Sequence, residues 1–374
     1  MPQTVYMDCN ATAPLRSEAR DAVVRALDAG GNPSSVHALG RAARRSVEDA
    51  RGQVRALVNA PDNARVIFTS GGTEANALAL NGCGRDKVFA PRTEHPSVLN
   101  ARAGVTTIRV DAGGLIDPFE LEEMFAGGGD DTLVSVMLAN NETGVLQQVE
   151  GIARIAHRYH ALVHTDAVQA VGKVAVDFQA LGVDYLTLSS HKLGGPQGAG
   201  ALITLADAPL KALQPGGGQE GGLRGGTENV PGIAGFGAAA QAAKAGLDDD
   251  MARIKALRDQ LEAGVAAIAP NAQVIAVAAD RLPNTSMIVM PGVASDTQVM
   301  AFDLAGICLS AGSACASGKA KASGVLTAMG VPADAAKCAL RVSLGHQNTA
   351  DEIQSFLSVW KDLYQRSGAK RTAA

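Results

Sequence analysis

The sequence predicts an α/β protein in which a mostly parallel sheet is flanked by helices and is followed by a smaller α+β domain. Short apolar, β-branched runs alternate with helical patterns over the first two-thirds of the 374 residues, which is typical of βαβ units. After residue 246 an acidic stretch, 248–250, opens a long amphipathic helix, and strand patterns become sparser. We therefore expect a boundary between two domains near 245–250.

The individual strands follow from the apolar runs. In the first part they are expected at 66–69, 87–90, 105–110, 133–139, 162–165, 183–188 and 200–204. Helices are expected between them, for example at 38–59, where Val47, Val54 and Val58 share one face at helical spacing. In the second part strands are expected at 273–278, 285–290 and 340–344.

Composition excludes several classes of protein. Hydrophobic residues make up 47% and charged residues 19% of the chain, so a disordered protein is not expected. The sequence contains no run of about 18 apolar residues, which argues against a membrane span. Its acidic N-terminal segment does not resemble a signal peptide. A net charge of −4 without a Lys/Arg block argues against a nucleic-acid partner.

The five cysteines predict free thiols and a cytoplasmic protein. They stand at positions 9, 83, 308, 315 and 338, and neither their odd number nor their spacing suits a disulfide scaffold or a zinc site. Cys315 differs from the others because small polar residues surround it and Lys319 and Lys321 lie nearby. Such a setting favours the thiolate, so Cys315 is the candidate nucleophile.

Polar residues cluster directly after the predicted strands, at 69–74, 140–142, 164–166 and 189–192. In an open α/β sheet, ligands bind outside the carboxyl ends of the strands. Gly71, Gly72 and Thr73 join a strand to a helix, where free N–H groups and a hydroxyl suit one phosphate. The alternative is an ordinary helix start with a threonine near its cap.

Lys192 and Asp166 complete this pattern. Lys192 stands between an apolar strand and a glycine-rich loop, where partial desolvation would lower its pKa as a Schiff-base lysine requires. Asp166 ends another strand and could either cap a helix or hold a heteroaromatic nitrogen in its protonated form. A phosphate site, an imine lysine and this carboxylate are together the parts of a site for pyridoxal 5'-phosphate (PLP).

The three histidines at 157–164 and the glycine-rich segment at 216–226 can each be explained with or without a functional role. His157, His160 and His164 need not face one point, so we expect no metal site. The segment 216–226 has seven glycines in eleven positions. It is either a flexible surface loop or backbone that approaches a phosphate or a second subunit.

Over nearly its full length the sequence resembles the class V, fold-type I PLP enzymes. Within them it resembles the cysteine desulfurases of the nitrogen-fixation/iron–sulfur-cluster type, in the first desulfurase group. The matching segments are 6–14, 31–37, 68–74, 94–96, 139–144, 164–169, 189–198, 216–229, 312–315 and 341–345. The resemblance implies a fold-type I PLP-dependent transferase, with a large PLP-binding domain at 16–247. Residues 1–15 and 248–374 would form the small domain that carries the catalytic-cysteine loop.

The resemblance also implies three catalytic residues. Lys192 would form the imine with PLP and later act as acid and base. His95 would stack on the cofactor ring and help to move protons. Cys315 would attack the sulfur of the substrate cysteine, leaving alanine and a persulfide on Cys315. The segment 318–324, which follows Cys315, departs from the usual pattern of the family.

The remaining implied residues bind cofactor and substrate. Asp166 would pair with the pyridinium nitrogen, Gln169 would contact the ring hydroxyl, and Arg341 would take the substrate carboxylate beside Asn141. Thr227 would reach the phosphate from the partner subunit of a homodimer. The full implied cofactor set is Gly72, Thr73, His95, Asn141, Asp166, Gln169, Ser189, His191, Lys192 and Thr227.

The leading hypothesis is therefore an L-cysteine desulfurase that passes sulfur to an acceptor protein such as an iron–sulfur scaffold. A selenocysteine lyase or an aminotransferase would use the same scaffold. Comparing kcat/KM for cysteine and for selenocysteine would distinguish a desulfurase from a selenocysteine lyase. A non-catalytic assembly partner is the third hypothesis, and the joint presence of Lys192 and Asp166 argues against it.

Overall fold

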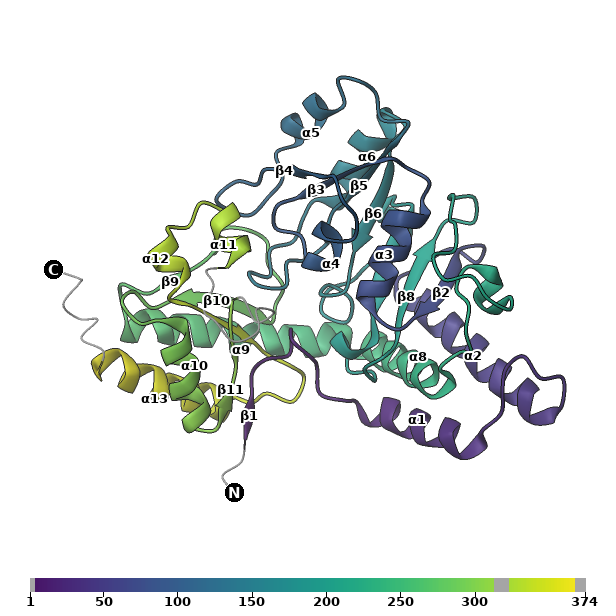
Figure 1. Ribbon diagram of the computed structural model, residues 1–374. Helices are drawn as coiled ribbons and strands as arrows, with labels where there is room; N and C mark the ends of the chain where they lie inside the picture. Colours follow the sequence, from purple (N-terminus) through teal and green to yellow (C-terminus); the bar gives the residue numbers. More distant parts are fainter. Residues whose placement is uncertain (1–3, 313–322, 367–374) are drawn as a thin grey trace.

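The largest sheet in the described part of the chain has seven strands in the order β2-β8-β7-β6-β5-β3-β4 (Figure 1). They are β2 (Arg65–Thr69), β3 (Lys87–Pro91), β4 (Val105–Ile108), β5 (Thr132–Ser135), β6 (Leu162–Asp166), β7 (Tyr185–Ser189) and β8 (Gly200–Thr204). Strands β4, β3, β5, β6 and β7 are parallel, whereas β8 runs antiparallel to both β7 and β2. The structure is a computed structural model that describes residues 4–312 and 323–366. The predicted α/β fold with a mostly parallel sheet is confirmed.

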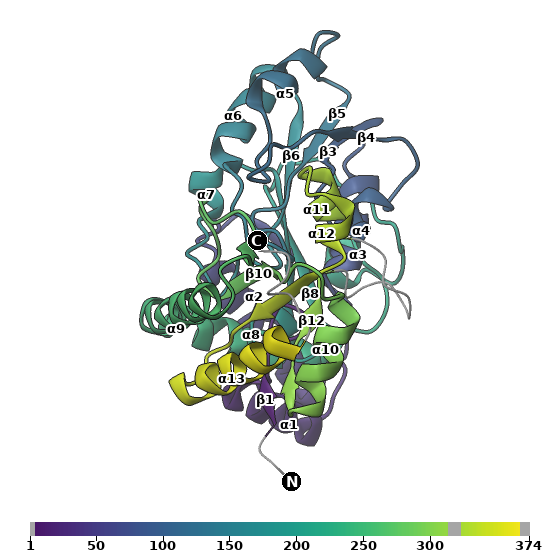
Figure 2. The ribbon, with the colours of Figure 1, turned by 90° about the vertical axis from the view of Figure 1, so that its left-hand side faces the viewer.

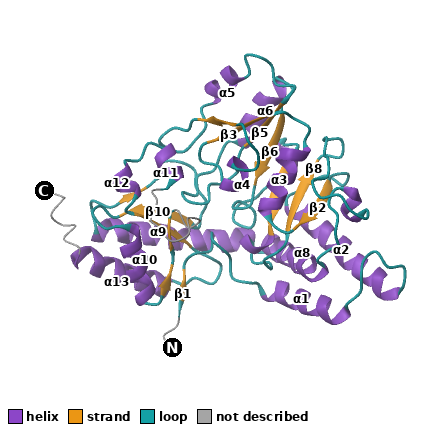
Figure 3. Ribbon diagram, viewed as in Figure 1, coloured by secondary structure: helices purple, strands orange, loops and turns teal. Residues whose placement is uncertain are grey.

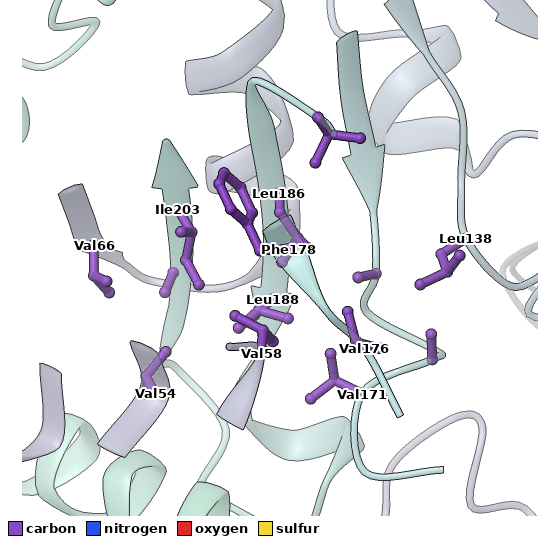
Figure 4. Packing of buried hydrophobic residues seen from close by; sticks show 14 of the residues in the cluster. Val54, Val58, Val66, Leu138, Val171, Val176, Phe178, Leu186, Leu188 and Ile203 are labelled. Carbon is purple, nitrogen blue, oxygen red and sulfur yellow. The ribbon is translucent and has the colours of Figure 1, made fainter. Parts of the chain in front are cut away.

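Both faces of this sheet are buried, which explains why its strands are continuous apolar runs. Along β2, Val66 and Phe68 join one core cluster while Ile67, which points to the opposite face, joins another. Figure 4 shows the first cluster, in which strand residues pack against side chains of the covering helices. The labelled residues are Val54, Val58, Val66, Leu138, Val171, Val176, Phe178, Leu186, Leu188 and Ile203.

Helices cover the two faces of the sheet. Figure 2 shows α5 to α7 on one side and α3 and α4 on the other. The helices of this part are α1 (Ser17–Ala29), α2 (Ala38–Leu57), α3 (Gly72–Gly82), α4 (Pro96–Leu99), α5 (Pro118–Met124), α6 (Val149–Arg158), α7 (Phe178–Leu181) and α8 (Val230–Ala245). The helix predicted at 38–59 is confirmed as α2, with Val47 and Val54 on its buried face.

The rest of the chain forms a second helix-and-sheet assembly (Figure 3). A four-stranded sheet has the order β12-β13-β10-β9, and β1 pairs with β11. The elements are β1 (Val5–Tyr6), β9 (Gln273–Val274), β10 (Thr285–Val289), β11 (Ile307–Cys308), β12 (Ser310–Ala311), β13 (Ala339–Ser343), α9 (Leu247–Ile268), α10 (Ser295–Leu304), α11 (Gly324–Ala328), α12 (Ala333–Ala336) and α13 (Ala350–Arg366). Through β1, the N-terminal segment pairs with β11, in which Ile307 lies opposite Val5.

Several predicted strands are too long: 105–110 by two residues, and 133–139 and 273–278 by four each. The strand predicted at 133–139 ends at Ser135 as β5, although Val136 and Leu138 still donate to carbonyls of the neighbouring strand β6. The strand predicted at 273–278 ends at Val274, because Ala276 adopts a φ of 56° that turns the chain out of the sheet. Apolar composition alone does not reveal such a turn. None of the helices described here has the length and apolar character that crossing a membrane requires.

Candidate active site

A cavity of about 260 Å³ lies at the carboxyl ends of β6 and β7, where the two parts of the chain meet. Ten of the residues that the sequence singled out line it: Gly72, Thr73, His95, Asn141, Asp166, Gln169, Ser189, His191, Lys192 and Arg341. Thr227 is exposed and does not line this cavity as the described residues form it, so its role across a dimer stays a prediction. Cys315 lies outside the described residues.

One end of the cavity is suited to an anion. Helix α3 begins at Gly72, and its N-cap residue, Gly71, has no side chain that could bond the first N–H groups of the helix. A Cβ on Gly72 would stand 2.9 Å from Val168 Cγ2, and a Cβ on Gly200 would stand 2.5 Å from the backbone of Gly71. Glycine at both positions therefore lets the start of α3 approach the strand ends closely. The hydroxyl-bearing residues Thr73 and Ser189 line the cavity here.

A carboxylate occupies another wall. Asp166, at the end of β6, accepts hydrogen bonds from Asn76 Nδ2 at 2.7 Å and from the backbone of Val168 at 2.9 Å. Sequence reasoning missed Asn76, although it lies three residues after Thr73 and thus on the same face of α3. The two neutral donors hold Asp166 in place without neutralising its charge, which suits a protonated ring nitrogen.

His95 has a defined tautomer. It caps α4, and its Nδ1 accepts a hydrogen bond from the backbone N–H of Ser97 at 3.1 Å. In the neutral ring the proton must then be on Nε2. Burial lowers the pKa of His95; the charge of Asp166 opposes this effect and that of Lys192 adds to it. We therefore expect a neutral imidazole at pH 7, with one proton available for donation.

The lysine amine is held by the N-terminal segment. Lys192 lies in a single 3₁₀ turn (Ser190–Lys192) after β7, and its Nζ donates to the carbonyls of Asn10 at 2.6 Å and Ala11 at 2.7 Å. The neighbouring His191 pairs its Nδ1 with Thr12 Oγ1 at 3.0 Å. Burial and the charges of two lysines lower the pKa of His191 to about 4, so this ring is neutral at physiological pH.

Arg341 enters the cavity from the second assembly, on β13. Its side chain is only 3% exposed, and Nη2 pairs with Asp8 Oδ1 at 2.7 Å while Nη1 donates to the Asn141 carbonyl at 3.0 Å. The Nε atom is buried and has no hydrogen-bond partner among residues 4–312 and 323–366. A guanidinium with a donor to spare is suited to a carboxylate ligand. Sequence reasoning did not find Asp8 as its partner.

The histidines considered for a metal site do not converge. His157 pairs with Asp184 at 3.0 Å, whereas the buried His164 lies between Ser135 and Thr187. Within the described ranges, no group of three or more His, Cys, Asp or Glu residues is placed to hold a metal ion. His157 and His164 are thus held by polar side chains beside and inside the sheet.

The glycine-rich segment is folded back on itself. Gly216 and Gly225 approach so closely that a Cβ on either would stand 2.6 Å from the other's backbone. Glu220 anchors the segment through Arg51 at 2.8 Å and the Phe68 backbone at 3.0 Å. These contacts fix part of the segment, most of whose residues are exposed; its approach to a phosphate or a second subunit stays a prediction.

The cavity fits PLP. An amine, a carboxylate held by two neutral donors and a glycine-lined helix start match the aldehyde, the ring nitrogen and the phosphate of that cofactor. Fold and site together thus define a PLP-dependent enzyme. Comparison with known proteins agrees: the model of the class V aminotransferase family matches residues 5–356.

The individual relatives are more specific. The chain is 44% identical over 372 residues to a cysteine desulfurase of Cereibacter sphaeroides, covering 96% of this chain and 95% of the relative. A solved NifS-like protein from Rickettsia africae ESF-5 is 35% identical with a TM-score of 0.91, covering 97% of this chain and all of its own. The solved structure of SspA in complex with cysteine is 28% identical with a TM-score of 0.79, covering 92% and 100%. The chain belongs to the class V aminotransferase family, among its cysteine desulfurases.

Proposed function

We propose that this chain is an L-cysteine desulfurase, which converts L-cysteine to L-alanine and retains the sulfur as a persulfide on Cys315. The observation that carries the proposal is the convergence of Lys192, Asp166 and Arg341 on one cavity. An amine, a carboxylate and a carboxylate-binding guanidinium are what PLP and an α-amino acid together require. The similarity to the SspA–cysteine complex supports cysteine as the substrate.

Each polar wall of the cavity has a task in this reaction. PLP, when bound, supplies the electron sink that makes the substrate's bonds labile. Asp166 would keep the ring nitrogen protonated, and Gly72, Thr73 and Ser189 would hold the phosphate. Arg341 would orient the substrate carboxylate through its guanidinium, whose Nε has no hydrogen-bond partner within the described ranges. Lys192 and the Nε2–H of His95 are the groups placed to move protons.

The sulfur transfer balances without an external oxidant. The thiolate of Cys315 attacks the substrate sulfur, so that an S–S bond forms while the substrate C–S bond breaks. The electron pair of that C–S bond stays with the substrate carbon, which takes up a proton and becomes the methyl group of alanine. The proton of the substrate thiol stays on the terminal sulfur of the Cys315 persulfide or is released from it to solvent.

We further propose a cytoplasmic homodimer that delivers the persulfide sulfur to an acceptor protein of iron–sulfur cluster assembly. The exposed position of Thr227, away from the cavity of its own chain, is what a residue serving a second subunit's phosphate would show. The free thiols Cys9, Cys83, Cys308 and Cys338 are compatible with a reducing compartment.

The proposal is tested by Cys315→Ala, with Cys308→Ala as the matched control. The PLP-loaded wild type, given cysteine without added thiol, should yield one alanine per chain, and the peptide containing Cys315 should gain the mass of one sulfur atom. Cys315→Ala should lose both products by at least about a hundredfold, while the control retains them. Alanine and sulfide formation at the full rate in Cys315→Ala would overturn the persulfide mechanism.

A further inference from the structure

A second lysine, which unlike Lys192 is buried, lies near the cavity, and none of the roles above uses it. Lys173 is 6% exposed and does not line the cavity, as far as the described residues define it. It follows Gly172, whose φ of +77° favours glycine. A Cβ at Gly172 would also stand 3.1 Å from Leu193 Cβ. The turn at Gly172 thus directs Lys173 inward, seven residues after the end of β6.

Lys173 makes two hydrogen bonds, both to groups of the site. Its Nζ donates to Gln169 Oε1 at 2.6 Å and to Asn10 Oδ1 at 2.8 Å. An ammonium only donates, so the side-chain amide of Gln169 must present its oxygen to Lys173. The NH₂ group of Gln169 is thereby turned the other way, where it donates to the Asn10 carbonyl at 2.9 Å.

The same carbonyl also holds the amine of the site. Asn10 O accepts from Gln169 Nε2 and from Lys192 Nζ, so Gln169 and Lys192 meet at one atom on the cavity wall. The Asn10 side chain accepts from Lys173 and donates to Thr285 Oγ1 at 2.9 Å, which ties the arrangement to β10. Lys173 is therefore one corner of a closed hydrogen-bonded ring with Gln169 and Asn10.

We propose that Lys173 is a positioning residue, which holds the NH₂ group of Gln169 toward the cavity so that bound PLP meets a hydrogen-bond donor there. Without Lys173 the Gln169 amide could rotate and present its carbonyl oxygen instead. An anionic oxygen on the cofactor is stabilised by a donor and repelled by an acceptor. The inference rests on the cavity as a PLP site and is independent of which amino acid is the substrate.

The charge of Lys173 does not limit this role. Burial lowers its pKa to about 7; Lys192 and Arg341 act in the same direction and Cys9 opposes them. Below that pH Lys173 is an ammonium with three N–H groups, and above it the amine keeps two. Two are enough for Gln169 Oε1 and Asn10 Oδ1. The orientation of Gln169 should hold on both sides of neutral pH.

The test combines Lys173→Met and Gln169→Leu, singly and together, in the full chain. One readout is the affinity of the PLP-free protein for PLP, and the other is the pH midpoint of the visible absorbance after loading. Lys173→Met should weaken PLP binding about tenfold and raise the midpoint by about one pH unit. In the Gln169→Leu background the same substitution should change neither value, because its effect passes through Gln169.

Further variants keep the inference falsifiable. Lys255→Met, which removes a surface lysine paired with Asp259 at 2.7 Å, should leave both readouts unchanged. If Lys173→Met does not fold, Lys173→Ala replaces it with the same expected changes in both readouts, whereas Lys173→Gln, which removes the charge but keeps a donor, should keep the wild-type midpoint. Unchanged readouts in Lys173→Met, or a shift that persists in full beside Gln169→Leu, would overturn the inference. Neither readout involves cysteine, so a failure of the proposed desulfurase activity would not affect them.

Discussion

Replacing Glu142 with glutamine is expected to remove a pH dependence from the stability of the fold. Glu142 is 8% exposed, and its Oε2 accepts a hydrogen bond from Ser323 Oγ. On the other side, a Cβ on Gly312 would stand 3.3 Å from the same oxygen. Burial raises the pKa of Glu142 from 4.5 to about 7, although Ser323 and Arg341 act in the opposite direction. Near neutral pH, this carboxyl is thus half protonated in the folded protein.

The sign of the effect follows from proton binding. Between pH 4.5 and 7 the folded state keeps the Glu142 proton whereas the unfolded state loses it, so wild-type stability falls as pH rises through this window. Each pH unit between the two pKa values is worth about 1.4 kcal/mol, which gives about 3 kcal/mol in all. Above pH 7 Glu142 is ionised in both the folded and the unfolded state, so the unfolding free energy falls no further on account of this group. Glutamine has the shape of the protonated side chain and does not titrate.

Urea unfolding of wild type and Glu142→Gln, with PLP removed, measures this difference directly. Relative to wild type, the variant should gain about 3 kcal/mol in unfolding free energy between pH 4.5 and 7. The surface variant Glu150→Gln, which loses only an exposed pair with Arg154, should follow the wild-type profile. Parallel profiles for wild type and Glu142→Gln would refute the assignment of a raised pKa to Glu142.

Three further outcomes are expected. Asp8→Asn leaves the buried guanidinium of Arg341 without its 2.7 Å ion-pair partner and should cost about 3 kcal/mol in urea unfolding; a loss below 1 kcal/mol would contradict the pairing. Gly200→Ala places a Cβ 2.5 Å from the Gly71 backbone and should weaken PLP binding about tenfold, measured by titration of the PLP-free protein; unchanged affinity would show that the start of α3 can move. His95→Gln should lower kcat about a hundredfold while PLP stays bound, and a wild-type kcat would remove His95 from proton transfer.

Most strands of the large sheet could be predicted from the sequence because each is a local pattern of apolar residues. Lys192 and Asp166 were found for the same reason, since a polar side chain directly after a buried strand stands at the edge where ligands bind. The limits of 133–139 and 273–278 could not be predicted in this way. They depend on where strand pairing stops, as at Ala276, where a positive φ ends β9.

Asn76 and Lys173 are residues of the site region that the sequence analysis did not identify. Both lie close in the chain to predicted site residues: Asn76 stands three positions after Thr73 on α3, and Lys173 stands four positions after Gln169 in the turns that follow β6. The sequence does not say that Asn76 bonds Asp166 or that Lys173 bonds Asn10, because those partners come from elsewhere in the chain. Position in the chain places a residue beside a predicted site residue, but it does not identify the group that its side chain meets.

By itself, the sequence determined the alternation of strands and helices and the strand-end positions of Lys192 and Asp166, because each depends on residues close together in the chain. The choice of a PLP-type site followed from the chemical types of these residues. Only the tertiary structure decided that Arg341 pairs with Asp8, 333 positions away, and that Asn10 holds Lys192 and Gln169 at one carbonyl. The physical reason is that periodicity reports which side of an element is buried. Which polar groups share that buried space depends on how the elements pack.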